Sequence, residues 1–139
     1  MFIMAYFDQF FNQKNPSFSI VIEDDDKVCY AYLYHNHKIV GDVWIYNSVE
    51  TVDIVDWRNK EDLPFANPNN FVKINIMPFN QSSQINVSWG VDNNIVFAEI
   101  YLVDALLVRL KEGACPGWST LVKEDGPLAL IYMDRIAQN

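Results

Sequence analysis

The sequence predicts a mainly β domain, with α+β character only at its margins: an antiparallel meander or sandwich-like sheet with short N- and C-terminal helices. Segments that alternate apolar and polar residues, separated by Asn, Asp and Gly, are typical of strands and turns. Of the 139 residues, 50% are hydrophobic and 14% are aromatic, so the chain can fill a core and is not disordered. Its length corresponds to a single globular domain over residues 1–139.

The two predicted helices lie near the ends of the chain. Residues 5–12 carry phenylalanines at helical spacing, and Pro16 shortly afterwards stops a helix. Residues 119–125 are followed by Gly126 and Pro127, a common ending of a helix. Between these segments the apolar pattern mostly has a period of two, which predicts strands.

The first predicted hairpin joins strands over 18–23 and 28–34. A three-residue turn at 24–26, made of aspartates, sets Ile20 opposite Tyr30. This register collects the large apolar groups on one face of the sheet, and such a face is what specifies a register.

A second hairpin adds a third strand over 39–46. An even-length loop around 36–37 is preferred, since an odd loop would place Asp42 among apolar side chains. The even loop pairs Tyr34 with Ile39. The resulting meander has a buried face with five large residues: Ile20, Ile22, Tyr30, Tyr32 and Val43.

Beyond the meander the pattern predicts further strands and one long loop. Residues 57–70 contain two prolines and several Asn and Asp residues, which indicate an ordered loop. Residues 104–113 fit either a helix capped by Asp104 or a strand that returns from a turn there, and we favour the strand. Strands are expected at four other places: 51–55, 71–76, 85–89 and 95–102.

Charge and cysteine content bound the function. The chain carries 10 Lys and Arg against 18 Asp and Glu, a net charge of −8, so it repels polyanions and we expect neither nucleic acid nor membrane as a partner. Cys29 and Cys115 are too few for a disulfide framework, and the apolar N-terminus lacks the basic residues of a secretory signal. We therefore expect a cytoplasmic protein with reduced thiols and no cofactor.

The segment PGWSTLVKEDGPLA, from Pro116 to Ala129, resembles the ending of a family of small bacterial proteins. The stretches EDDDKVCYAYL and VGDVWIYN share the resemblance more loosely. It implies a bacterial cytoplasmic family, and it brings no activity and no catalytic residues with it.

Candidate catalytic and metal-binding residues are few. His35 and His37, at i and i+2, would point the same way on a strand, but a metal needs three or four ligands and only Asp42 lies nearby. Exposed polar residues at a hairpin tip explain both histidines, so we expect no bound metal. No nucleophile elbow, phosphate-binding loop or dinucleotide motif is present in the sequence, and we expect no enzymatic activity. A metal-dependent hydrolase that uses His35, His37 and Asp42 is the third hypothesis.

Two aromatic regions are candidate binding surfaces. Trp44 and Tyr46 fall on the second face of the meander together with Asp42, where they could bind a sugar, an amine or a basic side chain. The competing interpretation is that C-terminal elements cover this face. The other region is the long loop, which contains Trp57 and Phe65.

The leading functional hypothesis is a non-catalytic domain that binds a basic protein, in the manner of an immunity protein or inhibitor. The acidic turn is expected to form part of a charged rim around the aromatic anchor of the long loop: Asp24, Asp25 and Asp26. The alternative is a domain that binds a small molecule or carbohydrate on an aromatic sheet face. The sequence does not decide whether the chain forms a homodimer.

Overall fold

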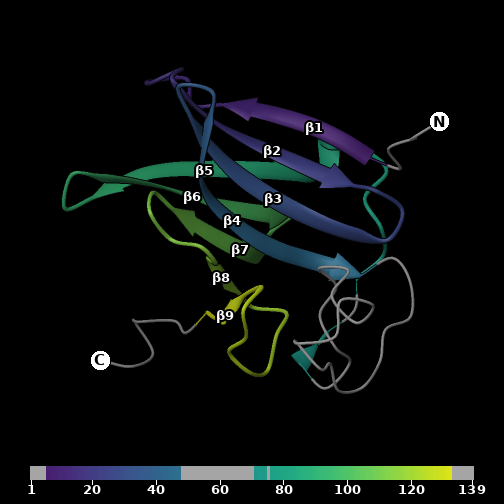
Figure 1. Cartoon of the computed structure of the whole chain (residues 1–139). Coiled ribbons are helices and arrows are strands. Elements are labelled where there is room, and N and C mark those ends of the chain that lie inside the picture. The colour runs from purple at the N-terminus through teal and green to yellow at the C-terminus, as the bar shows by residue number, and fades with distance from the viewer. Residues whose placement is uncertain (1–5, 48–70, 75, 133–139) are drawn as a thin grey trace.

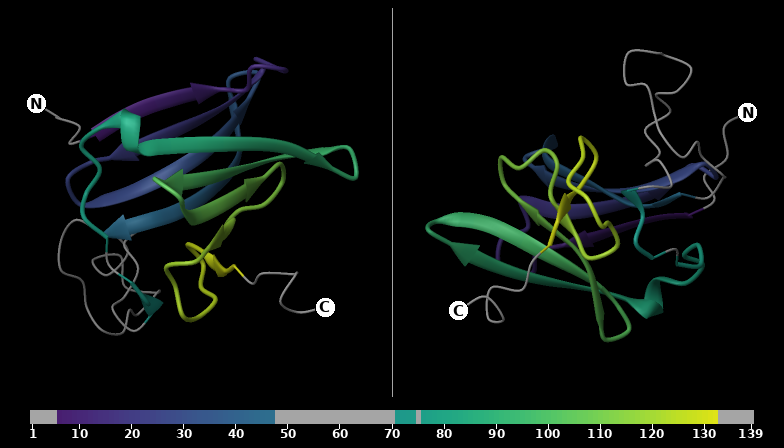
Figure 2. Two further views of the ribbon diagram at one scale, coloured as in Figure 1. Left: turned by 180° about the vertical axis from the view of Figure 1, so that it is seen from behind. Right: turned by 90° about the horizontal axis from the view of Figure 1, so that it is seen from below.

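A computed structural model describes residues 6–47, 71–74 and 76–132 of the chain. These residues form two β-sheets, which confirms the mainly β prediction (Figure 1). The four-stranded sheet lies in front of the five-stranded sheet in Figure 1, and the reverse view in Figure 2 exchanges them. Residues of both sheets contribute to the same hydrophobic core.

All neighbouring strands of the first sheet are antiparallel, in chain order: β1 (Tyr6–Phe11), β2 (Phe18–Asp24), β3 (Val28–His35) and β4 (Lys38–Asn47). The 3₁₀ helix η3 (Ser82–Gln84) leads into the second sheet. That sheet also follows chain order, and its last two strands are parallel to each other: β5 (Ile85–Asp92), β6 (Ile95–Leu102), β7 (Ala105–Lys111), β8 (Trp118–Ser119) and β9 (Leu130–Ile131).

The predicted N-terminal helix over residues 5–12 is wrong, because Tyr6–Phe11 forms strand β1. The spacing of the phenylalanines fits a helix, but it fits a strand equally well when the face is read with a period of two. Phe7 and Phe11 then point to the outside of the sheet and Phe10 packs against the core. Pairing with β2 decides between the two patterns, since aromatic residues pack well on a pleated surface.

The register of the β2–β3 hairpin also differs from the prediction. Ile20 lies opposite Leu33, not Tyr30, because the last pair of the hairpin is Asp24–Cys29, which encloses four residues where the prediction had a loop of three. Changing the parity of a loop turns the whole following strand over. The tyrosines at 30 and 32 therefore point outward, and Ala31 points into the core.

The β3–β4 hairpin confirms the even loop but not the register beyond it. Asn36 and His37 have φ values of 51° and 70°, as a two-residue type I′ turn requires, and Tyr34 lies opposite Ile39 as predicted. A β-bulge then shifts the pairing, so that Val43 lies opposite a core residue of β3 and on the other face from the outward tyrosines. The predicted buried face that joins Tyr30 and Tyr32 to Val43 is therefore wrong.

The second half of the chain follows the sequence more closely up to residue 111. The strands predicted at 85–89 and 95–102 are present, and the preference for a strand over a helix within 104–113 is confirmed. The predicted helix over 119–125 is wrong: Ser119 belongs to β8, and its hydroxyl accepts a hydrogen bond from the backbone N–H of Leu121.

The strand predicted over 71–76 is also wrong in its described part. Val72 forms an isolated bridge with Val122, and the neighbouring Lys73 N–H donates to the carbonyl of Leu121 at 2.7 Å. The predicted strand over 51–55 and the loop over 57–70 lie outside the described residues.

The two sheets are tied together along the outer edge of β4, which we call the closed side. Four backbone hydrogen bonds link β4 to the segment that follows β7: Gly113 N–H to Val40 O (2.8 Å), Asp42 N–H to Ala114 O (3.4 Å), Gly117 N–H to Asp42 O (2.7 Å) and Trp44 N–H to Leu128 O (3.1 Å). At the opposite margin, the open side, β1 and β5 are the terminal strands of their sheets (Figure 2).

Candidate binding site on the outer face of the four-stranded sheet

Strand β3 presents a row of tyrosines on the outer face of the four-stranded sheet. Tyr30, Tyr32 and Tyr34 alternate with buried residues, and all three are half-buried. The rings of Tyr30 and Tyr32 are stacked, with centroids 6.0 Å apart and an interplanar angle of 16°. Side chains on neighbouring strands flank this row, because the pairing registers place them directly opposite it.

Two carboxylates stand beside the tyrosines. Glu23 on β2 lies opposite Tyr30, and Asp42 on β4 lies opposite Tyr32. We call these five residues the tyrosine face: Glu23, Tyr30, Tyr32, Tyr34 and Asp42. At its margin, β1 contributes Phe7 and Phe11, which are 54% and 52% exposed.

The tyrosine face has a negative potential. Burial is the largest cause that raises the pKa of Tyr32, to about 12, and the charges of Glu23 and Asp42 add to it. Burial likewise raises the pKa of Tyr30, with further contributions from Tyr32, Asp42 and Asp25. A field that opposes the formation of a phenolate favours a cation at the same place.

Asp42 connects the tyrosine face to the closed side. Burial raises the pKa of its carboxyl group, and a hydrogen bond from the Cys115 thiol partly offsets this. Burial and the Asp42 charge in turn raise the pKa of Cys115, so this exposed cysteine has little thiolate character. The pair therefore positions the Asp42 carboxylate and does not form a nucleophilic site.

The predicted aromatic surface around Trp44 and Tyr46 is wrong. Both side chains are fully buried, and a second β-bulge, between the pairs Tyr30–Trp44 and Cys29–Tyr46, turns them to opposite faces of the sheet. The Tyr46 hydroxyl donates to Asp24 Oδ2 at 2.5 Å and accepts from the backbone N–H of Phe79 at 3.0 Å. Trp44 lies opposite Tyr30 on the face of the tyrosines, but it is completely buried there. Of the predicted residues that the structure describes, only Asp42 is therefore part of the candidate surface, and the tyrosines take the role expected of Trp44.

The acidic turn is less exposed than predicted. Asp24 is completely buried, and its Oδ1 accepts a hydrogen bond from the backbone N–H of Asp26 at 2.8 Å. Asp25 accepts from the N–H groups of Lys27 and Val28 at 2.9 Å and closes the turn. Asp26 is exposed with φ at 71°, so the predicted rim of three aspartates consists of two, both held by the turn.

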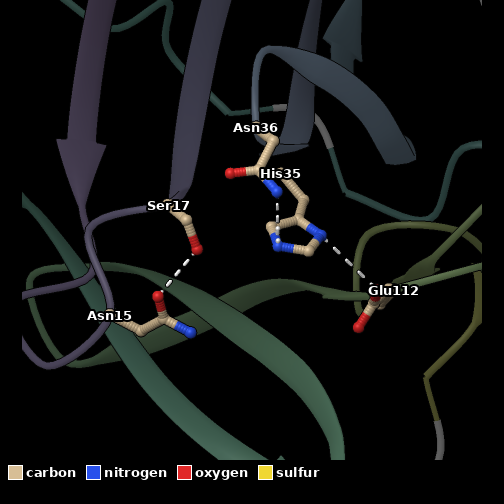
Figure 3. A network of polar contacts seen from close by, with 5 residues as sticks. All are labelled: Asn15, Ser17, His35, Asn36 and Glu112. Carbon is tan, nitrogen blue, oxygen red and sulfur yellow. Dashed lines mark hydrogen bonds and ion pairs between the residues drawn. The ribbon is translucent and has the colours of Figure 1, made fainter.

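His35 serves as a contact between the two sheets (Figure 3). Its ring stacks on Phe18 with centroids 4.0 Å apart, and its Nδ1 lies 3.8 Å from Glu112 Oε2 at the end of β7. Asn36 Nδ2 lies 3.3 Å from the other ring nitrogen. His37 is an exposed residue of the turn with φ at 70° and does not join this network. In the part of the chain that the structure describes, no three His, Cys, Asp or Glu side chains come together as metal ligands.

Trp57 and Phe65 lie among residues that the structure does not describe. Within residues 6–47, 71–74 and 76–132, no helix is long and apolar enough to cross a membrane. The sequence analysis assigned the tyrosines of β3 to the buried face because it expected an odd number of residues in the β2–β3 loop. The alternation of tyrosines with smaller residues in β3 is nevertheless visible in the sequence.

Comparisons of the chain with family models, with curated proteins and with solved structures give no match. The resemblance of the segment from Pro116 to Ala129 to a bacterial family therefore stays a prediction. The fold and the surface define the class: a two-sheet β domain with an acidic aromatic face.

Proposed function

We propose that the protein is a non-catalytic binding domain whose tyrosine face takes basic side chains of a protein partner. The observation that carries the proposal is the row of three half-buried tyrosines with a carboxylate on either side, Glu23 and Asp42. A basic protein is the partner class that fits this chemistry, with this chain acting on it in the manner of an immunity protein or inhibitor.

An arginine side chain fits the tyrosine face in two ways. Its guanidinium group can lie over a tyrosine ring, a contact worth about 0.5–1 kcal/mol at an exposed site. It can also donate to a carboxylate in a bidentate manner, which a lysine cannot do. Phe7, which is 54% exposed at the margin, supplies apolar area on which the rest of a partner can pack.

The net charge of −8 supports a basic partner through long-range attraction, which raises the association rate at low salt. Our proposal keeps the cytoplasm as the location, since both cysteines are free thiols: Cys29 is buried and Cys115 is exposed. Nucleic acids are not proposed as partners, for the same reason of charge.

The first test uses a short arginine-rich peptide as the probe and its glutamate-rich counterpart as the control. We expect the arginine peptide to shift the NMR signals of Tyr30 and Tyr32, and added salt to weaken the effect. Glu23→Gln together with Asp42→Asn should reduce the affinity severalfold, since each exposed charge pair contributes up to about 1 kcal/mol. Equal binding of both peptides, or shifts confined to another surface, would refute the proposal.

The second test identifies the natural partner by capture on immobilised protein. The double variant serves as the matched bait, and the folded state of both baits is compared by circular dichroism. A partner retained by the wild type and lost by the variant supports the proposal if it is basic. A partner that binds both equally contradicts the use of the tyrosine face.

A second candidate function has a specific observation in its favour. On the outer face of the five-stranded sheet, Trp118 is half-buried beside Arg109, whose guanidinium lies 4.1 Å from the centre of the Phe97 ring. Glu99 lies opposite Arg109 and accepts from the Tyr132 hydroxyl at 3.3 Å. Aromatic rings with such polar groups also suit a carbohydrate or small molecule. Quenching of tryptophan fluorescence by a panel of sugars, abolished by Trp118→Ala, would favour this alternative.

A further inference from the structure

The open side of the molecule contains a groove that the tyrosine face does not use. It has a volume of about 510 Å³ and lies between β1 and β5. The two strands run side by side along this margin of the sandwich (Figures 1 and 2). The groove is lined by eight uncharged residues, although the chain is strongly acidic: Gln9, Phe10, Phe11, Gln13, Ile85, Asn86, Val87 and Trp89.

Strand β5 lacks the features that normally protect the edge of a sheet. Within the described residues no strand pairs with its outer edge, and the β5–β6 ladder runs without a register shift. Lysine, proline and bulges are the usual devices that block edge-to-edge pairing. The strand has none of these, and its one charged residue, Asp92, lies at its end. An unprotected edge next to an uncharged groove suits a further β-strand.

The hairpin turn fixes which backbone groups face outward. Asn93 and Asn94 form a two-residue turn with φ at 52° and 67°, so Asp92 and Ile95 are hydrogen-bonded to each other. Hydrogen-bonded and non-hydrogen-bonded pairs alternate along an antiparallel ladder. The outward N–H and C=O groups of β5 therefore belong to its odd-numbered residues: Ile85, Val87, Trp89 and Val91.

We propose that a second copy of this chain covers the open side, with β5 of the two copies paired antiparallel about a twofold axis at Ser88. A ladder can form only between outward groups, so odd-numbered residues must pair with odd-numbered residues. Centring on Ser88 pairs Val87 with Trp89 of the second copy and Ile85 with Val91, which satisfies every outward residue. A twofold interface repeats each of these contacts.

This register is also self-complementary in its side chains. The apolar residues Ile85, Val87, Trp89 and Val91 meet one another, and the exposed Asn86 and Ser88 meet Gly90 and Ser88 of the second copy. Val91, which is 66% exposed in the single chain, becomes covered by Ile85. Two chains of net charge −8 can meet here because the groove between them holds no charged side chain.

The oligomeric state of the full chain gives the first test. Sedimentation velocity over a range of protein concentrations should show a species of twice 16.1 kDa. Added salt should preserve or strengthen it, because screening reduces the repulsion between like charges. This response is opposite in sign to that of the tyrosine face, so the two proposals fail independently. A monomer at all concentrations would overturn the inference.

Cross-linking tests the register itself. In a Cys115→Ser background, Ser88→Cys places two thiols opposite each other in a non-hydrogen-bonded pair, where Cα atoms are about 4.5 Å apart and a disulfide can form. Mild oxidation should therefore give a covalent dimer. Asn86→Cys is the matched control, since it faces Gly90 of the second copy and should not cross-link. Cross-linking of both variants alike, or of neither, contradicts this register.

An edge variant completes the set. Val91→Lys puts a charge on an exposed position of the β5 edge and should convert the dimer to a monomer with an unchanged circular dichroism spectrum. Ile39→Lys, at a residue that is 50% exposed on β4, is the control and should remain dimeric. A dimer that survives Val91→Lys would refute pairing through β5.

Discussion

The closed side and the open side of the sandwich differ in the interactions that join the two sheets. On the closed side, backbone hydrogen bonds join β4 to Gly113, Ala114, Gly117 and Leu128. On the open side, β1 and β5 meet through side chains that line a groove, and the outer edge of each strand is unpaired among the described residues. The comparison indicates that one margin is built for stability and the other is available for association.

The largest expected effect would break the closed side. A Cβ on Gly117 would lie 2.4 Å from the backbone carbonyl oxygen of Arg109, an atom that cannot move without disturbing the sheet. Gly117→Ala should therefore lower the free energy of unfolding by about 3 kcal/mol, in the upper range of overpacking effects. Urea denaturation measures the change.

The matched substitution is on the open-side strand. A Cβ on Gly90 would also have its nearest contact at 2.4 Å, but with the Phe97 ring, which can rotate aside. Gly90→Ala should cost about 1 kcal/mol, less than Gly117→Ala. Equal losses for the two variants would mean that the closed side is no more rigid than the open side.

The next effect concerns the hydrogen bonds beneath the tyrosine face. Tyr46→Phe removes a bond to the buried Asp24 carboxylate and leaves the Phe79 N–H without its acceptor. Bonds to charged groups contribute about 1.5–3 kcal/mol, so the variant should lose about 2 kcal/mol of stability. Tyr32→Phe, on the half-exposed outer face, is the control and should change the stability by less than about 0.5 kcal/mol. Thermal unfolding of both variants compares the two faces of one sheet.

The sequence predicts the strands better than their registers. Alternation locates β2, β3 and β6, because a half-buried strand must repeat every two residues. It cannot locate the bulge near Val40 or the extra loop residue after Asp24, since each depends on contacts with distant parts of the chain. These two local irregularities determine which aromatic residues are exposed.

The candidate site was predictable only in its chemistry. A carboxylate beside aromatic rings on a sheet face describes the tyrosine face correctly, but the rings belong to β3 and not to Trp44. The predicted rim of exposed aspartates is wrong at Asp24. Its carboxylate is buried because it accepts a hydrogen bond from the buried Tyr46 hydroxyl. No pattern in the sequence predicts that Tyr46 is the hydrogen-bond partner of Asp24.

Alkaline titration compares the core and the outer face of the four-stranded sheet. Burial raises the pKa of Tyr46 above its usual 10.0, with smaller contributions from Cys29 and Asp24. The folded state then binds the proton of the Tyr46 hydroxyl more tightly than the unfolded chain does. The contribution of this group to the free energy of unfolding is therefore complete below pH 10 and is lost as the pH rises through the pKa of the folded state.

Ultraviolet absorbance of tyrosinate provides the measurement. Tyr32 should ionise in the folded protein with a pKa of about 12, while Tyr46 should ionise only together with unfolding. The Tyr46→Phe variant should lose less stability between about pH 9 and pH 12 than the wild type. An identical pH dependence in both proteins would contradict the role assigned to Tyr46.

The smallest expected effect lies in the turn between β6 and β7, next to the start of the open-side strand. Val103 has φ at 56°, a conformation that a β-branched residue adopts only under strain, and its N–H donates to Gln84 O at 2.8 Å. The other two-residue turns have Asn36 or Asn93 at this first position, with φ at 51° and 52°, where asparagine is tolerated. Val103→Asn should therefore raise the stability by about 0.5–1 kcal/mol, since the 62% exposed side chain has little packing to lose. Asn93→Ala should lower it by a similar amount, and a loss of stability in Val103→Asn would show that packing of the valine outweighs its backbone strain.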